Sequence, residues 1–337
     1  MAISSGSNPH RAWVTVNGIL LPVTAGSAEQ NATRRSSTFS GQIPLGYPGA
    51  ELLFSTLATN DTTISVLSNG AQQALVAGEI DNTTIDYIGG VISFSGRCKS
   101  AKLHAQKTAE KWINKKPHEI IKDLAGRVGL SVDIDQSLLQ AGRFVQIDWA
   151  KLTDNISFMT VIHKAAEFMG ARWWVDAKGV LHVKSTGNPQ SFYTINYAPG
   201  PTKKADCLAL SITRNIQAGK PCSVSVKSFH AGQKKTYVGS YSIGGAGETV
   251  QYSFHLPGHS QDHANQHARS KVMEHARHEL QLSATLVGDP MIDVAMKLQL
   301  NGTLFAQGFD MDCVHHIFGI QGHTMQISAR SAKEGRS

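Results

Sequence analysis

Apolar and polar positions alternate along the first hundred residues, in short runs that Gly, Pro, Asn and Ser interrupt. Alternation with period two is typical of β-strands that bury one face. Asn17-Gly18 separates two such runs and predicts a tight hairpin, because these residues accept positive φ angles. The polar segment 25–37 predicts an exposed loop or a strand at a sheet edge. Residues 1–105 are therefore expected to form an N-terminal β-barrel-like domain.

After residue 105 the apolar period changes to that of a helix. One amphipathic helix is predicted to start at Pro117 and to stop at Gly129, with an apolar stripe between them. A second is predicted over about 155–169, with Gly170 as its stop. Proline fits the first helical turn and glycine supplies the left-handed conformation after the last one.

The two helical segments look like copies of one unit. Segment 119–135 matches segment 160–176 in its helix, its glycine stop, its following strand and its closing aspartate. A hairpin through residues 176–179 is expected to add the last strand. We therefore expect residues 106–187 to form a small α/β domain built from two similar units.

Strand signals return in residues 188–337, which are expected to form a second β-barrel-like domain. One long helix, at about 260–280, interrupts it, and a final hairpin is predicted near Gly319 to Gly322. The predicted class is mainly β, with two β-barrel-like domains flanking an α+β insert.

Composition excludes several classes of protein. The 337 residues are 41% hydrophobic and 17% charged, which predicts a folded chain. No run reaches the ~20 apolar residues of a transmembrane helix, and no signal peptide begins the chain, so synthesis as a cytosolic protein without membrane insertion is expected. The net charge of +7 comes from scattered Lys and Arg and does not predict nucleic-acid reading.

Candidate chemistry is sparse. His263 and His267 lie one helical turn apart and are weak candidates for metal ligands, but no Glu lies between them to act as a general base. A solvated helix face is the favoured interpretation. Asp310 and Asp312 could form a carboxylate pair, yet a turn that begins a strand is favoured.

No catalytic residue, cofactor site or metal site is therefore predicted, and the chain is not expected to be an enzyme. Cys98, Cys207, Cys222 and Cys313 lack Cys-x-x-Cys spacing and are interpreted as buried thiols.

Trp173 and Trp174 are the weak candidates for an interface. Neighbouring residues of a strand point to opposite faces, so at least one of the two is expected outside the small domain's own core. For each tryptophan taken singly, core packing is slightly favoured.

Three stretches, at 74–103, 210–237 and 260–330, together resemble the baseplate hub proteins of tailed phages. This is the late-control gene D-like family, which also includes the hub part of type VI secretion spikes. In the last stretch, His315 or His316 and Thr324 match the family's closing hairpin. The segment starting at Asp293 departs from the family, which often has Pro-Gly there.

The resemblance implies a structural hub: a homotrimeric ring that adapts a sixfold tail tube to a threefold spike. Its implied partners are the tail tube or a tube adaptor, a separate central spike protein, the tape-measure protein and DNA in transit. A contractile tail is the favoured context, with the protein synthesised in the bacterial host cytoplasm and located in the baseplate of the virion. The alternatives are a tail-associated cell-wall hydrolase, a glycan-binding tail module and a type VI spike hub.

Overall fold

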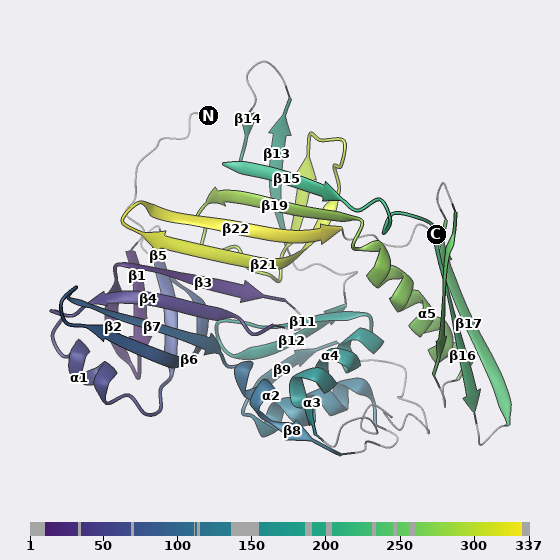
Figure 1. Ribbon diagram of the computed structural model, residues 1–337, viewed down its shortest axis with the longest axis horizontal. Coiled ribbons are helices and arrows are strands. Elements are labelled where there is room, and N and C mark those ends of the chain that lie inside the picture. Colours follow the sequence, from purple (N-terminus) through teal and green to yellow (C-terminus); the bar gives the residue numbers. More distant parts are fainter. Residues whose placement is uncertain are drawn as a thin grey trace.

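The fold is dominated by β-strands. The computed structural model describes residues 11–32, 35–68, 71–110, 112, 115–135, 155–185, 191–199, 204–230, 234–244, 248–256 and 260–331. One 14-stranded sheet runs through the molecule, and three small sheets and a few helices accompany it (Figure 1). Among the described residues, no helix is long and apolar enough to cross a membrane.

The N-terminal half packs two layers of strands face to face. One layer contains β1 (Arg11–Val16), β2 (Ile19–Val23), β5 (Thr62–Ser68) and the first part of β6 (Ala71–Asp86). The other contains the rest of β6 with β3 (Ala25–Asn31), β4 (Thr38–Pro44) and β7 (Val91–Cys98), and α1 (Ala50–Ser55) follows β4. The predicted Asn17-Gly18 hairpin is confirmed, with φ angles of 50° and 83°.

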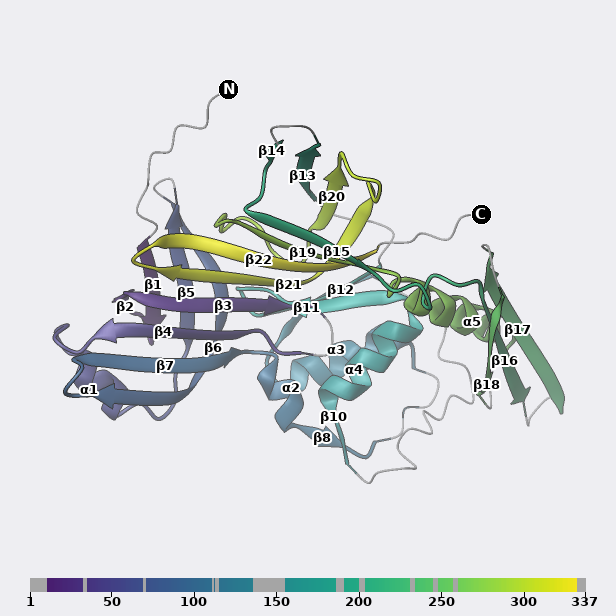
Figure 2. The same cartoon turned by 45° about the horizontal axis from the view of Figure 1, so that its top comes forward.

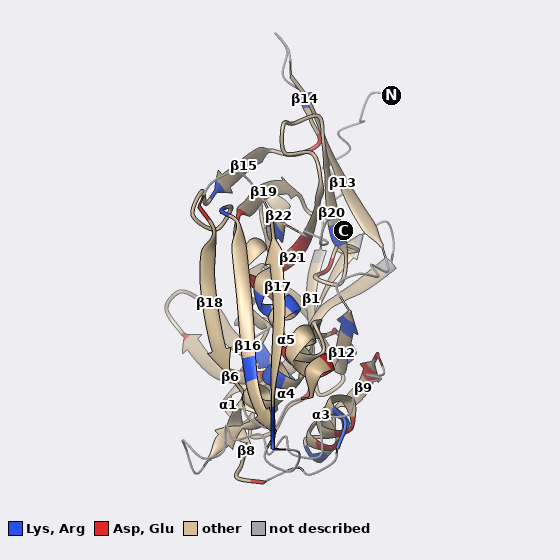
Figure 3. Cartoon of the chain, turned by 90° about the vertical axis from the view of Figure 1, so that its right-hand side faces the viewer, with Lys and Arg blue, Asp and Glu red and all other residues tan. Residues whose placement is uncertain are grey.

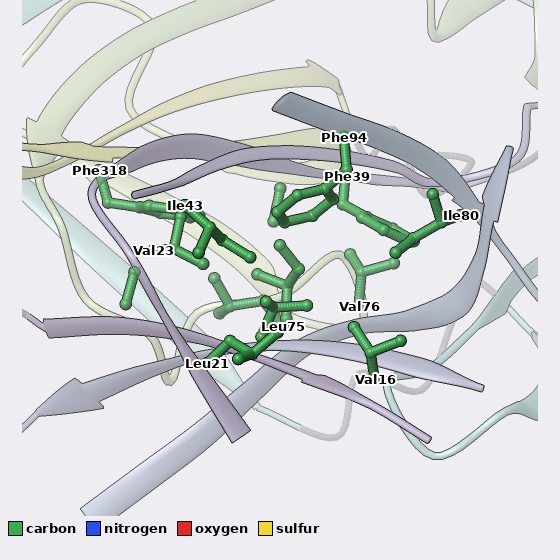
Figure 4. Close-up of a cluster of buried hydrophobic side chains, with 14 of the residues drawn as sticks. Val16, Leu21, Val23, Phe39, Ile43, Leu75, Val76, Ile80, Phe94 and Phe318 are labelled. Atoms are coloured by element: carbon green, nitrogen blue, oxygen red, sulfur yellow. The ribbon is translucent and has the colours of Figure 1, made fainter. Parts of the chain in front are cut away.

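Large apolar side chains fill the space between these two layers (Figure 4). Leu21 and Leu75 come from one layer and Phe39, Ile43 and Phe94 from the other, all almost fully buried. Phe318, from far along the chain, belongs to the same core. The N-terminal half is thus completed by a residue of the C-terminal half.

The expectation for segment 25–37 was wrong for residues 25–31. Residues 25–31 form β3, which pairs with β4 on one side and with β21 on the other, so it is a central strand. Polar residues are tolerated there because they alternate with Gly26 and the buried Ala28, and small inward residues suit a crowded junction.

The insert contains the two predicted helix–strand units. In the first, α3 (Pro117–Arg127) precedes β9 (Ser131–Ile134); in the second, α4 (Phe158–Phe168) precedes β11 (Ala171–Val175) and β12 (Val180–Ser185). Both glycine stops are confirmed: φ is 76° at Gly129 and 65° at Gly170. The strand order is β11-β12-β9. Short elements α2 (Ala101–Ala105), β8 (Lys107–Thr108) and β10 (Ile156–Ser157) complete the described part of the insert.

The C-terminal half continues the same large sheet. Its strands are β13 (Phe192–Ala198), β14 (Lys204–Ala205), β15 (Ala209–Arg214), β19 (Leu280–Val287), β20 (Lys297–Asn301), β21 (Gly308–Gly319) and β22 (Gly322–Ser331). The predicted hairpin at Gly319 to Gly322 is confirmed.

A separate arm interrupts this half between β15 and β19. Its sheet has the order β17-β16-β18, formed by β16 (Cys222–His230), β17 (Lys235–Ile243) and β18 (Val250–His255). The predicted long helix is present as α5 (Gln261–Ala276) and packs on this sheet, where Gly239 allows close approach to Ala264. Figure 2 shows the arm at one end of the molecule.

Two of the sequence-based expectations are corrected here. Segments 208–217 and 222–232 are expected from the sequence to pair in one antiparallel β domain within residues 188–337, but β15 joins the large sheet, whereas β16 joins the arm and pairs with β18 in parallel. The two predicted barrels are also absent: within the described residues the strand order stays open, and the two halves share one sheet. Hydrophobic alternation does not distinguish a closed sheet from an open two-layered one.

Candidate assembly surfaces

The described part of the large sheet contains the same arrangement of strands twice. Its main array, in spatial order, is β6-β7-β4-β3-β21-β22-β19-β15. The set β3, β4, β6, β7 of the N-terminal half matches the set β15, β19, β21, β22 of the C-terminal half, in chain order and in spatial order. In both halves the long strand also pairs with the second layer, β6 with β5 and β21 with β20.

One irregularity occurs at the same place in both halves. A β-bulge at Asp81 interrupts the pairing of β6 with β7, and a bulge at Asp312 interrupts that of β21 with β22. At each bulge the aspartate accepts two hydrogen bonds from an arginine of the neighbouring strand, Arg97 or Arg330. These hydrogen bonds hold the pKa of both guanidinium groups above the ordinary value. The two halves therefore share this bulge and the arginine–aspartate pair that accompanies it.

The halves meet where β3 pairs antiparallel with β21. Ala28 lies opposite His316, and Gly26 lies opposite Phe318. Gly26 is required there, because a Cβ atom on it would lie 2.8 Å from the Phe318 ring and closer still to the Ser40 carbonyl oxygen. In the spatial order of the array, this junction joins the last strand of the N-terminal unit, β3, to the first strand of the C-terminal unit, β21.

The main array ends in two strands whose outer edges have no strand partner among the described residues. At one end, β15 pairs only with β19. At the other, the second part of β6, beyond Gly78, pairs only with β7. Open edges of this length are templates for pairing with another chain.

One face of the main array is polar and the other packs on the two cores. The inward positions are apolar, for example Phe94 and Ile327. The alternate positions carry mostly small hydroxyl and amide side chains that are partly or fully exposed, among them Ser40, Gln42, Ser93, Ser95, Thr84, Ser211, Thr213, Ser283, Thr285, Thr324, Gln326 and Ser328.

The loops at one end of the array are apolar. The strand registers place five segments at this end: the β6–β7 turn, the β21–β22 turn, the segment after β4, the segment after β19 and the residue before β15. Figure 1 shows α1 and the β21–β22 hairpin there, on the left. Six exposed apolar side chains form what we call the apolar rim: Leu52, Ile88, Leu208, Val287, Met291 and Ile320.

The rim repeats between the halves. Ile88 is at the tip of the β6–β7 hairpin, and Ile320 is at the tip of the equivalent β21–β22 hairpin. Their relative exposures are 101% and 98%, so neither isoleucine is buried by its own chain. Contiguous exposed apolar side chains of this kind mark interaction sites.

No protein-family model matches the sequence, and no curated protein is detectably similar to it. Solved structures are similar over nearly the whole chain. A tail protein from Neisseria meningitidis superposes with a TM-score of 0.72 and 12% identity, covering 96% of this chain and 97% of that one. The 43 kDa tail protein of prophage MuSo2 from Shewanella oneidensis gives a TM-score of 0.69 with 12% identity, covering 96% and 98%.

The chain has the fold of phage tail proteins.

A third similar structure links this tail fold to secretion. It is an Escherichia coli component of the type VI secretion system, described as structurally similar to the bacteriophage T4 tail proteins gp27 and gp5. Its TM-score is 0.59 at 9% identity, covering 96% of this chain and 78% of that one. The resemblance to baseplate hub proteins that three sequence stretches carried is thus confirmed at the level of the fold.

Within this tail fold, His263 and His267 lie one turn apart on α5, the first buried and the second half-buried. His263 is 7% exposed, its Nδ1 lies 2.8 Å from the Ser260 hydroxyl, and its ring packs against Phe168. His263 is therefore buried, and the solvated helix face expected for it is wrong. The described residues contain no group of three or more His, Cys, Asp or Glu that could hold a metal ion.

Asp310 and Asp312 do not begin a strand, contrary to expectation; both lie inside β21. Asp310 is 1% exposed, and two guanidinium groups reach it: Nη2 of Arg277 at 3.0 Å and Nη1 of Arg172 at 3.6 Å from its carboxylate oxygens. Arg172 also donates to the carbonyl oxygens of Met311 and Val294. Burial lowers the pKa of Arg172, and Asp310 opposes that effect.

These contacts explain how charged residues occur inside a sheet. Arg172 comes from β11 of the insert and Arg277 from the end of α5, so Asp310 connects the insert, the arm and the C-terminal half. The sequence did not reveal this junction, because the three partners are far apart along the chain.

Trp173 and Trp174 point to opposite faces of β11, as predicted. Trp173 lies in the core of the insert, with Leu181 and Val183. Trp174 belongs to the core of the C-terminal half and stacks on His182, with ring centroids 5.3 Å apart. The two are 1% and 7% exposed, so the contact made by Trp174 is between parts of one chain.

The interpretation of the four cysteines as buried thiols is confirmed for two of them. Cys98 and Cys222 are buried, whereas Cys207 and Cys313 are half-buried.

Proposed function

We propose that this protein is the structural baseplate hub of a phage tail, in which three chains close a ring. The internal repeat of the main array carries this proposal. Each chain presents two equivalent units in the same orientation, so a threefold ring presents six similar units. Such a ring adapts a sixfold tail tube to a threefold spike, because each symmetry finds matching surfaces on it.

The polar face of the main array is suited to line the bore. Its core face is covered by second-layer strands in both halves, which leaves the hydroxyl- and amide-bearing face for the ring's interior. Side chains such as Ser95, Thr213 and Ser283 offer no base-specific pattern and few fixed charges. The tape-measure protein and DNA would pass such a surface without binding tightly during ejection.

The two ends of the ring would meet different partners. The apolar rim carries two equivalent hairpin tips per chain, Ile88 and Ile320, which fits a sixfold tail tube or tube-adaptor ring. The opposite end leads from β7 into the insert, which occurs once per chain and so fits the threefold spike. The hub would therefore stand in the baseplate of the virion, between tube and spike, with a contractile tail as the favoured context.

This role needs assembly surfaces and no catalysis. The competing hypothesis, a tail-associated cell-wall hydrolase, is tested by turbidity of purified peptidoglycan. We expect no clearing, and clearing that a buffer control lacks would contradict the hub proposal.

Light scattering on the purified chain tests the ring itself. We expect a mass three times that of the chain, and negative-stain images with an open centre. Addition of the spike protein should give a single complex with three copies of the hub. A chain that stays monomeric at all concentrations, with spike and tube proteins present, would sink the proposal.

A further inference from the structure

The junction inside the chain is a template for the junction between chains. β3 and β15 occupy the same position in their units, and so do β21 and β6. Inside the chain β3 pairs with β21, whereas β15 and the second part of β6 have open outer edges among the described residues. The partner that fits the edge of β15 is therefore the edge of β6 in a second copy of this chain.

The strand registers make this correspondence residue-specific. Ser27 lies opposite Ser40 on β4, and Ser211 lies opposite Ser283 on β19. On its other side, Ser40 lies opposite Ser95 of β7, and Ser283 lies opposite Ser328 of β22. Ser95 and Ser328 each pair with the first residue after the bulge of the long strand. Ser27 and Ser211 are thus equivalent, and Ala28 and Glu29 are equivalent to Ile212 and Thr213.

The bulges fix the correspondence of the other two strands. Asp81 and Asp312 are equivalent because each accepts the paired arginine hydrogen bonds of its unit. The residues that follow each bulge are then matched one by one along the two long strands. His315, His316 and Ile317 pair with β3. Their equivalents on β6 are Thr84, Ile85 and Asp86.

We propose that β15 of one subunit pairs antiparallel with the second part of β6 of the next, with Ile85 opposite Ile212 and Thr84 opposite Thr213. The inference rests on the proposed homotrimeric ring and specifies its closure. The interface is heterologous, since two different edges meet, and a heterologous contact closes into a ring when its rotation matches the symmetry.

The side chains at this edge agree with the register. Ile85 and Ile212 are both partly buried against the cores of their own units, so pairing them would extend one core into the next. Inside the chain, Phe318 enters the core of the neighbouring unit. Its equivalent on β6 is Tyr87, which is 67% exposed in the single chain and would lie opposite Leu210 of the next subunit.

The charges at the edges also permit contact. The outward pairs would be Thr84 with Thr213 and Asp86 with Ser211, and Thr83 would lie opposite Arg214. No like charges would face each other in this register. A shift by one residue would turn Ile85 or Ile212 to the polar face, which disfavours that alternative.

Cysteine pairs test the register. Thr84→Cys with Thr213→Cys places two thiols on residues opposite each other, where Cα atoms are about 4.5–5.5 Å apart and a disulfide forms readily. Thr84→Cys with Ser211→Cys is the matched control: it is on the same face, but the diagonal neighbours are about 7–8 Å apart. The single variants and the parent chain, with its own four cysteines, complete the set.

We expect the Thr84/Thr213 pair to give a covalent trimer on a non-reducing gel, at least tenfold faster than the Thr84/Ser211 pair. The mass of each variant before oxidation is measured by light scattering. A trimer without this cross-link, or with faster linkage of the control pair, would overturn the register and leave the hub proposal standing. A monomer in the parent chain would overturn both.

Discussion

Arg330 donates two hydrogen bonds to Asp312, from Nε to Oδ2 at 2.5 Å and from Nη2 to Oδ1 at 2.7 Å. Arg97 holds Asp81 in the same way at the equivalent bulge, with distances of 2.7 and 2.9 Å. A bulge leaves one residue of a strand unpaired and bends the strand. Because both long strands change layers near their bulges, each arginine pair fixes the bend that lets one strand serve two layers.

The two pairs should contribute unequally to stability. Arg330 and Asp312 have side-chain exposures of 30% and 21%, whereas Arg97 and Asp81 have 52% and 32%. We expect Arg330→Gln to lower the free energy of unfolding by about 1.5–3 kcal/mol, the range for hydrogen bonds to charged groups. Arg97→Gln should lower it by about 0.2–1 kcal/mol, as for exposed ion pairs. Urea unfolding at one fixed protein concentration measures both, and an equal or larger loss for Arg97→Gln would contradict the assignment.

Removing Arg172 should be more damaging. Its guanidinium is buried, lies beside Asp310 and donates to two carbonyl oxygens of the C-terminal half. Arg172→Met leaves a buried carboxylate with fewer partners, and we expect a loss of about 3–5 kcal/mol.

Arg127→Met is the matched control for Arg172→Met. Arg127 also binds two acidic side chains, Glu110 and Asp123, but its own side chain is 39% exposed. Its loss should cost less than about 1 kcal/mol. Similar losses for the two variants, measured by thermal and urea unfolding, would show that burial of the Arg172 contact does not matter.

Local signals predicted the local structure well. Asn17-Gly18 gave the first hairpin, Pro117 and Gly129 bounded α3, and Gly170 ended α4. In each case the residue limits its own φ angle or its own hydrogen bonds, so no distant contact is needed to decide the outcome.

Distant pairings were missed for a physical reason. β3 is polar in sequence yet central in the sheet, because Phe318 and β21 cover it from the other half. The repeat of the two halves was missed because most equivalent positions share geometry and not residue type. The one readable signal was an aspartate followed by an arginine 16 or 18 residues later, at Asp81 and at Asp312.

Acid should weaken the C-terminal half through His316. This side chain is 0% exposed, with its Nδ1 3.1 Å from Nε2 of His323, and burial lowers its pKa to about 4. In the unfolded chain a histidine takes up a proton as the pH falls through about 6.5, whereas the buried His316 stays neutral until about pH 4. The stability of the folded state is therefore fully present above about pH 6.5. This stability is lost as the pH falls from about 6.5 toward 4, at about 1.4 kcal/mol per pH unit for one proton.

Urea unfolding at several pH values checks this slope. His316→Leu should flatten the dependence between pH 6.5 and 4 by about the contribution of one proton. His104→Leu, at an exposed position of α2, should leave the slope unchanged. If the slope survives His316→Leu, another group is responsible for it.

The apolar rim should hold the tail tube. Ile88→Ser with Ile320→Ser removes both exposed hairpin tips of a chain, and therefore all six tips of a trimer. Both side chains are almost fully exposed in the single chain, so folding should be unaffected. We expect binding to the cognate tube or tube-adaptor protein, measured by surface plasmon resonance, to weaken at least tenfold, which corresponds to about 1.4 kcal/mol.

Leu304→Ser separates a rim effect from a general loss of exposed apolar surface. Leu304 is 101% exposed, like Ile88, but it lies in the turn between β20 and β21, away from the rim. Figure 3 views the molecule from the side of the arm, and shows β20 near the second-layer strand β13. Because the tube would contact only the rim end of the main array, the Leu304→Ser variant should bind it with unchanged affinity. Both variants should keep the trimer mass, since none of the three substituted positions lies in β6 or β15. Equal binding by the rim variant and the wild-type chain would place the tube contact on another surface of the hub.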